Sequence, residues 1–244
     1  MEYFLKSDIL YEDDAILVVR KRAQVAVQSA RSGQMDLEHA LLNYLAGKQT
    51  AGKRQMPYLA VIHRLDQPVE GILVFGKTQK AAAALNRQLT GDQMKKRYLA
   101  VVEWKDTEQE GCLRQEQQLV DELYKDGRSN TSRVVQKGYP GAKQAVLSFQ
   151  ILEVCQEEGR ALAAITLKTG RHHQIRVQMA HAGMPLCGDK KYNPGAQPED
   201  GLALCAAELV FSHPISGKKL CFQTEPENPI FSRFNQIIIK SSQN

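Results

Sequence analysis

Apolar and polar residues follow two different periods along the chain, and the two periods predict strands and helices. Alternation with period two, or a short apolar run bounded by turn residues, predicts a strand. Apolar residues three or four positions apart, closed by a glycine, predict a helix. Strands are predicted within residues 8–20 (two, around an acidic turn), 59–62, 72–75, 98–104, 145–154, 161–168, 202–211 and 218–223, and helices at 36–46, 79–90, 174–182 and from Pro229 onward.

The predicted helices have polar caps and one apolar face each. Thr78 precedes helix 79–90 as a capping residue, and Gly91 ends it. The residues expected to face inward are Leu37, Leu41, Tyr44 and Leu45 in the first helix, Ile175, Met179 and Ala182 in the third, and Phe231, Phe234 and Ile238 in the last. Many strands with a few short helices predict an α+β fold around a mixed, mainly antiparallel sheet, and we expect residues 1–244 to form one domain.

Composition narrows the class of protein. With 43% apolar and 24% charged residues, the 244-residue chain has the balance of an ordinary globular protein. The net charge of +5 fits an anionic partner without requiring one. The five cysteines form no C-x-x-C pair, which favours free thiols in a reducing compartment. No signal peptide and no apolar stretch of membrane-spanning length occur, so we expect a cytoplasmic protein without a membrane partner.

A polar cluster separates the two apolar runs of residues 59–62 and 72–75. It contains His63, Arg64 and Asp66, more charge than a simple hairpin turn needs. A loop aspartate usually caps its own turn. Beside an arginine, however, Asp66 would stay ionised and would be a candidate nucleophile or base.

A second cluster lies in residues 167–183, where a predicted strand runs through Thr169-Gly170 into a predicted helix. Arg171, His172 and His173 then stand at a helix N-terminus, which favours phosphate. The alternative is that these are surface charges and satisfied loop histidines. A zinc site of His172, His173 and His181 is disfavoured, because neither adjacent histidines nor an eight-residue separation match a helical metal pair.

Four motifs resemble those of the RluA-type pseudouridine synthases. They are HRLD at 63–66 followed by Gly71, Lys-x-Tyr at 96–98, TGRHHQIR at 169–176 and GDKKY at 188–192, and the resemblance extends over nearly the whole chain. It implies a single catalytic domain with a central RNA-binding cleft. The implied reaction is the isomerisation of uridine in tRNA or rRNA, without a cofactor or a metal.

The resemblance also implies the roles of individual residues. Asp66 is the essential carboxylate, acting on the sugar either as a nucleophile or as a base at C2′. Tyr98, otherwise a candidate for core packing, stacks on the uracil, and Arg176 pairs with Asp66. The implied residues are Asp66, Tyr98 and Arg176 as catalytic, and Arg64 (which enters the space of the flipped base), Ile175 (a pocket wall), Arg171 and His173 as substrate-binding.

The chain departs from the family pattern at several positions. Val69-Glu70 replaces a small hydroxyl pair, and Lys21-Arg22 replaces Lys-Pro. An acid near Asp66 puts activity in doubt, so an RNA-binding protein with weakened catalysis is the alternative function. We expect no N-terminal S4 domain and a monomer. RNA contacts would then come from Arg20-Lys21-Arg22, Lys53-Arg54, Lys95-Lys96-Arg97 and Arg171.

Overall fold

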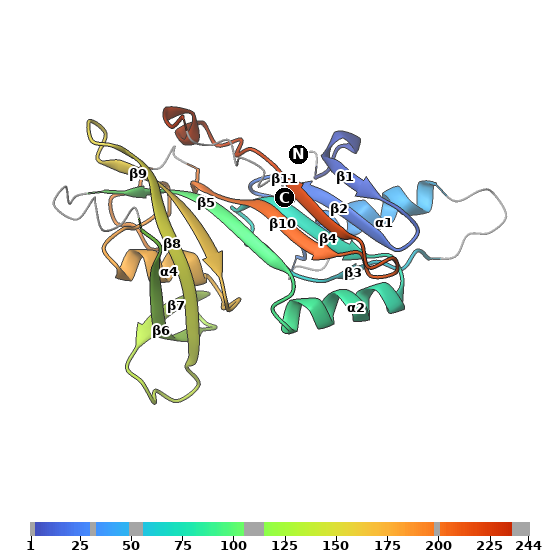
Figure 1. Cartoon of the computed structure of the whole chain (residues 1–244), viewed down its shortest axis with the longest axis horizontal. Helices are drawn as coiled ribbons and strands as arrows, with labels where there is room; N and C mark the ends of the chain where they lie inside the picture. The colour runs from blue at the N-terminus through green and yellow to red at the C-terminus, as the bar shows by residue number, and fades with distance from the viewer. Residues whose placement is uncertain (1–2, 30–32, 49–55, 105–114, 198–200, 236–244) are drawn as a thin grey trace. The chain divides into compact units, whose positions relative to one another are not determined.

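The computed structural model describes residues 3–29, 33–48, 56–104, 115–197 and 201–235. They belong to two compact units, whose helices and strands are labelled in Figure 1. Unit 1 is formed by residues 1–96 and 206–224, and unit 2 by residues 97–205 and 225–244. The strands and short helices of both units give the predicted α+β class, and every strand pairing with a described register is antiparallel.

Unit 1 is built on a sheet flanked by two helices (Figure 1). Its elements are a 3-10 helix η1 (Lys6–Asp8), β1 (Ile9–Glu12), β2 (Ile16–Lys21), α1 (Leu37–Gly47), β3 (Ala60–Val61), β4 (Glu70–Gly76), α2 (Gln79–Thr90) and β11 (Lys219–Gln223), with most of β10 (Leu204–Ser212). Strand β2 pairs with β1 on one side and β4 on the other, and β3 pairs with β4. The predicted strands on both sides of the first polar cluster are therefore confirmed.

Both helices of unit 1 begin at a polar cap. The side chain of Thr78 accepts a hydrogen bond from the backbone N–H of Ala81 at 3.1 Å, which satisfies one of the free N–H groups of the first turn of α2. Asp36 caps α1 in the same way. Helix α2 packs so closely on β4 that a Cβ at Gly76 would lie 2.9 Å from the backbone nitrogen of Ala82, so this position requires glycine.

Unit 2 is built on a second set of antiparallel strands, in the order β5-β9-β8-β6-β7. Its elements are β5 (Lys95–Glu103), β6 (Gln117–Asp126), β7 (Thr131–Val135), β8 (Lys143–Cys155), β9 (Arg160–Leu167), α4 (Gln174–His181) and a 3-10 helix η2 (Pro229–Arg233). Val177 of α4 packs on Leu123 of β6 and Ala145 of β8. The predicted buried strand at 98–104 is confirmed, because residues 98–102 are all buried.

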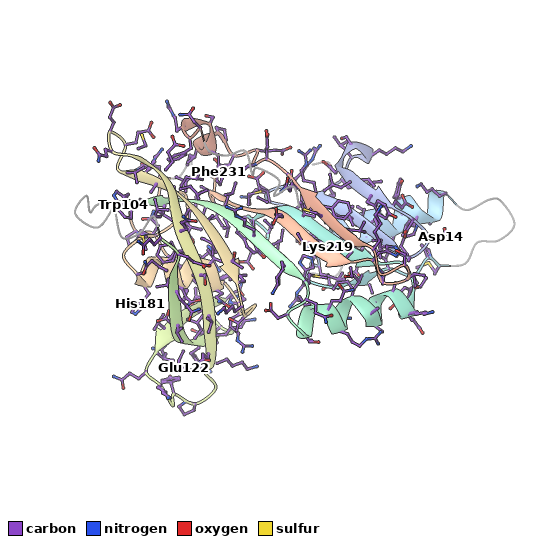
Figure 2. All side chains as sticks on the ribbon, in the orientation of Figure 1. Asp14, Trp104, Glu122, His181, Lys219 and Phe231 are labelled. Atoms are coloured by element: carbon purple, nitrogen blue, oxygen red, sulfur yellow. The ribbon has the colours of Figure 1, made fainter. Side chains whose placement is uncertain are left out.

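Two helix predictions need correction in unit 2. Ile175 and Met179 are buried as expected, but Ala182 is exposed because α4 ends at His181, which Figure 2 labels. The helix predicted from Pro229 is a single 3-10 segment, whose Phe231 is 1% exposed. Ile238 lies outside the described residues. A proline at the first position starts a helix but does not determine its length or its type.

The sequence predicted a reducing compartment from the cysteines and no membrane-spanning segment. Among the described residues, Cys155, Cys187, Cys205 and Cys221 form no disulfide, and Cys112 lies outside the described residues. Within the part of the chain that the structure describes, no helix has the length and apolar character needed to span a bilayer.

Candidate active site

The HRLD loop connects β3 to β4 at one end of their antiparallel pairing. The backbone N–H of Val69 donates to the carbonyl of Asp66 at 3.0 Å and closes a tight turn. Leu65 and Val69 are buried and anchor the loop, whereas Arg64 is exposed and Asp66 is partly exposed. Local packing therefore presents the Asp66 carboxylate with access to solvent.

Gly71 follows this turn and shows why the motif needs a glycine. Its φ is +130°, which side-chain-bearing residues rarely adopt. A Cβ there would lie 2.5 Å from both the backbone nitrogen and the backbone oxygen of Ala206. The glycine lets β10 approach the beginning of β4, immediately after the Asp66 turn.

A buried lysine lies beneath the loop, and sequence reasoning missed its role. Lys21 is completely buried, and its Nζ donates to the carbonyl oxygens of Val25 (2.7 Å), Arg22 (3.0 Å) and Gln67 (3.0 Å). Burial lowers the pKa of Lys21 to about 7, against the raising effect of the Asp66 and Glu70 carboxylates. Lys21 thus ties β2 to the residue next to Asp66.

The predicted RNA-contacting triplet at 20–22 is wrong for Lys21, because its side chain has no solvent exposure. Arg20 and Arg22 instead form ion pairs of 3.0 Å with the buried Asp8. Side chains along a strand alternate between its two faces, and this alternation could have indicated the difference. On strand β2, Lys21 points to the opposite side from its two arginine neighbours.

The sequence predicted that Glu70 would disturb the Asp66 loop, but the structure places its side chain in the core. Its side chain is 4% exposed, and its charge acts on the Lys21 ammonium. A buried carboxylate close to a buried cation has a compensating charge. The departure at Val69-Glu70 is therefore accommodated in the core of unit 1.

The second cluster forms the beginning of α4 in unit 2. His173 is the N-cap residue and adopts a left-handed conformation with φ of +54°. The side-chain oxygen of Gln174 accepts from the backbone N–H of Arg171 (2.9 Å) and from the Thr169 hydroxyl (2.8 Å). The side chain of Gln174, the first residue of α4, thus holds the loop that precedes the helix.

Arg176 forms a buried, bidentate ion pair. Its Nε and Nη2 donate to the two carboxylate oxygens of Asp189 at 2.8 and 2.6 Å, and both side chains are almost completely buried. The guanidinium also lies 5.2 Å from the ring centroid of Tyr192. Asp189 belongs to GDKKY, but sequence reasoning gave it no partner. The predicted pair of Arg176 with Asp66 joins residues of different units and stays a prediction.

Tyr192 links the GDKKY segment to α4 and to the β6–β7 hairpin. Its hydroxyl lies 2.7 Å from Nδ1 of His173 and accepts from the backbone N–H of Ser132 at 2.7 Å. Burial, with the positive charge of Arg176, lowers the pKa of His173 to about 3, so its imidazole is neutral at physiological pH.

The histidines of the disfavoured zinc hypothesis have other contacts. The rings of His172 and His173 stack at 3.8 Å between centroids. Both ring nitrogens of His172 are within hydrogen-bonding distance of the hairpin, at Ser132 and Asn130. Among the residues that the structure describes, no group of three His, Cys, Asp or Glu side chains is arranged to hold a metal ion.

The remaining predicted residues divide between the units. Tyr98 on β5 and Ile175 on α4 are buried in unit 2, to which Arg171 and Arg176 also belong. Arg64 and Asp66 belong to unit 1. The predicted site residues are therefore divided between the two units.

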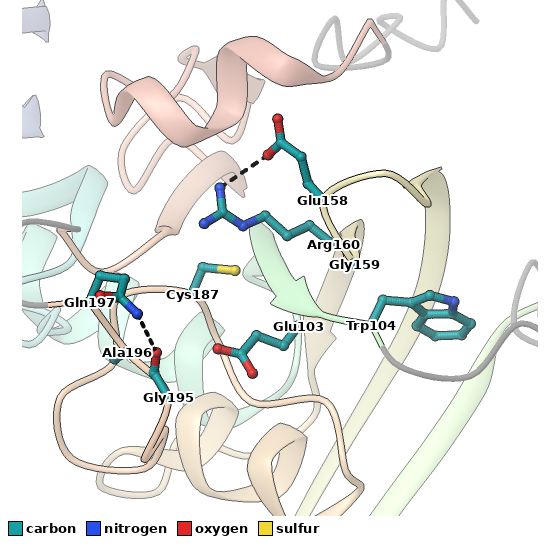
Figure 3. Close-up of a pocket in the computed structure, with 10 residues that line it drawn as sticks. Glu103, Trp104, Glu158, Gly159, Arg160, Cys187, Gly195, Ala196 and Gln197 are labelled. Carbon is teal, nitrogen blue, oxygen red and sulfur yellow. Dashed lines mark hydrogen bonds and ion pairs between the residues drawn. The ribbon is translucent and has the colours of Figure 1, made fainter.

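A surface pocket of about 300 Å³ in unit 2 contains none of the predicted site residues (Figure 3). Arg160 on its rim is paired with Glu158 at 3.2 Å, and Glu103 accepts a hydrogen bond from Asn193 at 2.7 Å. Since its charged side chains already have partners within the chain, this pocket offers no group that is poised for catalysis.

The chain is similar to known RNA-modifying proteins. The family model described as RNA pseudouridylate synthase matches residues 15–181. An uncharacterized RNA pseudouridine synthase, YhcT of Bacillus subtilis, is 33% identical over 86% of this chain and 65% of its own length. The ribosomal large subunit pseudouridine synthase D of Zymomonas mobilis is 31% identical over 96% of this chain and 74% of its own.

A solved structure gives the same fold. Human RNA pseudouridylate synthase domain containing 4 has a TM-score of 0.70 at 21% sequence identity, covering 91% of this chain and 90% of its own. Its likeness concerns the fold, whereas the family model and the relatives concern the sequence. The predicted α+β fold with a mainly antiparallel sheet is confirmed, and the chain belongs to the RNA pseudouridylate synthase family.

Proposed function

We propose that this chain isomerises uridine to pseudouridine in RNA, with Asp66 as the essential carboxylate. The observation that carries the proposal is the HRLD loop, in which Asp66 is partly exposed above the buried Lys21 ammonium. The family membership supports the same reaction. The chain spans 65% of the length of the first relative above, so the activity of that whole protein is a proposal here.

The proposed reaction needs no net change of atoms or electrons. The bond between N1 and C1′ breaks, the uracil turns, and a bond forms between C5 and C1′. The proton on C5 leaves, and N1 of the product carries a proton. Asp66 acts on the sugar in one of two ways. It attacks C1′ and forms an ester that breaks when C5 bonds to C1′, or it removes the C2′ proton and returns it to C2′ when C5 bonds to C1′.

The other proposed residues bind and orient the nucleotide. Tyr98 stacks on the uracil, Arg176 pairs with Asp66, and Ile175 forms an apolar wall. Arg64 occupies the place of the flipped base, because a stacked base cannot be reached by the enzyme. The remaining substrate contacts proposed are those of Arg171 and His173. We propose tRNA or rRNA as the substrate, and the printed names of relatives make large-subunit rRNA the first to test.

The test is tritium release from RNA labelled at uracil C5, comparing the wild type with Asp66→Asn. Total RNA from cells that lack the protein is the substrate, so unmodified sites are present. We expect release by the wild type and a loss of at least about a thousandfold in the variant, as for removal of a nucleophile or base. Circular dichroism of both proteins provides the folding control.

Two other outcomes would contradict the proposal. Equal release by Asp66→Asn would refute the role of Asp66. No release by a folded wild type that still binds RNA would indicate the binding-protein alternative, with Glu70 as the first residue to revert to serine or threonine.

A further inference from the structure

Two segments of unit 1 leave its core next to each other. Ile62, directly before the HRLD motif, and Met94, directly before β5, are buried in the same hydrophobic cluster. Each is followed directly by basic residues: His63-Arg64 after the first and Lys95-Lys96 after the second. The shared core therefore brings these polar groups into one neighbourhood.

This neighbourhood contains one buried polar atom without a partner and one half-buried lysine. Nε2 of His63 is buried and has no hydrogen-bond partner. The Lys96 side chain is half-buried, and the structure shows no hydrogen bond or ion pair for it with any described residue. A buried polar atom without a partner costs about 1–3 kcal/mol, so such atoms are rare unless water or a ligand satisfies them.

Lys95 provides an internal contrast. Its ammonium is exposed and forms an ion pair of 2.9 Å with Asp92. Asp92 also acts on Lys96, but only as a more distant charge. Two adjacent lysines therefore differ, because Lys95 is solvated and paired while Lys96 is partly desolvated and unpaired.

Lys96 carries the positive charge in this cluster, because His63 is neutral. Burial lowers the pKa of Lys96, and the Asp92 carboxylate partly opposes this effect. Burial, followed by the charge of Lys96, lowers the pKa of His63 to about 3, so His63 is a neutral imidazole. The partly desolvated Lys96 side chain therefore lies beside a neutral imidazole and forms no ion pair with a described residue.

We propose that Lys96 and His63 form a phosphate site that takes a backbone phosphate of the RNA substrate near the target uridine. The proposal rests on the proposed function, because Asp66 belongs to the same loop. A phosphate accepts hydrogen bonds from an ammonium and from a neutral imidazole N–H, and its negative charge pairs with Lys96. Lys96, and not its neighbour Lys95, is the residue of the basic run that contacts RNA.

The experiment compares Lys96→Gln with the matched control Lys95→Gln in the full-length chain. Binding of a single-stranded oligouridylate is measured over a range of salt concentrations. Loss of one phosphate contact reduces the slope of log K against log salt by about 0.7 for a single strand. We expect this decrease for Lys96→Gln and an unchanged slope for Lys95→Gln, with thermal unfolding confirming that both variants fold.

A second probe separates phosphate from base contacts. The same oligonucleotide with uncharged methylphosphonate linkages should bind wild type and Lys96→Gln equally. A persistent difference on the uncharged backbone would overturn the proposal, as would equal changes in slope for both lysine variants. Displacement of the oligouridylate by polyglutamate at lower concentration than by RNA would assign the site to an acidic protein and also overturn it.

The readout is independent of catalysis. Loss of tritium release in Asp66→Asn without any effect of Lys96→Gln on the slope would leave the isomerase function standing and reject the phosphate site. An effect on the slope in a protein that releases no tritium would support the phosphate site and reject the isomerase function.

Discussion

Replacing Lys21 by methionine tests the buried ammonium beneath the Asp66 loop. The folded-state pKa of about 7 lies below the ordinary value of 10.5. Between these two values the unfolded chain binds more protons than the folded chain, so the free energy of unfolding rises with pH. Methionine does not titrate. The stability difference between wild type and Lys21→Met must therefore grow as the pH increases.

The structure sets the size of this difference. From about pH 6 to about pH 9, the proton linkage of Lys21 stabilises the wild type relative to the variant by a further ~2–3 kcal/mol. At pH 6, removing the buried charge relieves about 4–5 kcal/mol. Three carbonyl oxygens also lose their donor, at about 1–3 kcal/mol each. The opposing effects nearly cancel at pH 6, and the variant is clearly less stable at pH 9.

Urea unfolding followed by circular dichroism at the two pH values measures the difference. Lys218→Met is the control, because Lys218 is an exposed lysine of the same unit. Its stability difference from wild type should stay constant with pH. A constant difference for Lys21→Met as well would refute the reasoning, since it would show that Lys21 keeps its ordinary pKa in the folded protein.

Two further substitutions test the other structural contacts. Arg176→Met leaves Asp189 buried without its partner and should cost about 3–5 kcal/mol in urea unfolding. Adding Asp189→Leu should restore most of that stability without restoring tritium release, whereas recovered release would contradict the proposed role of Arg176. Gly71→Ala places a Cβ 2.5 Å from the Ala206 backbone and should cost more than about 3 kcal/mol. An unchanged melting temperature in that variant would show that the β4–β10 approach is looser than described.

Local information in the sequence was sufficient for most elements. The period of apolar residues placed β1, β2, β4 and β5, and the capping residue Thr78 with Gly91 placed both ends of α2. These signals act within a few residues, because a helix cap or a strand face is decided by neighbours in the chain. Local information failed at the last helix, whose type and length depend on packing.

Motif spacing identified the loop of Asp66 and the segment of Arg176, but not how their charges are balanced. Asp189 is 13 residues from Arg176 in the sequence, and Lys21 is 46 residues from Gln67. Many acids and carbonyl groups lie at comparable separations, so sequence distance does not choose among them.

Only the tertiary structure decided which of several similar basic residues is buried, paired or unsatisfied. Lys21 lies in the core between two ion-paired arginines, and Lys96 lacks a partner next to the ion-paired Lys95. The physical reason is that alternation places neighbours on opposite faces, whereas the element that covers each face comes from a distant part of the chain. Sequence alone determined that this chain carries the groups of an RNA pseudouridine synthase, and the fold determined which environment each group occupies.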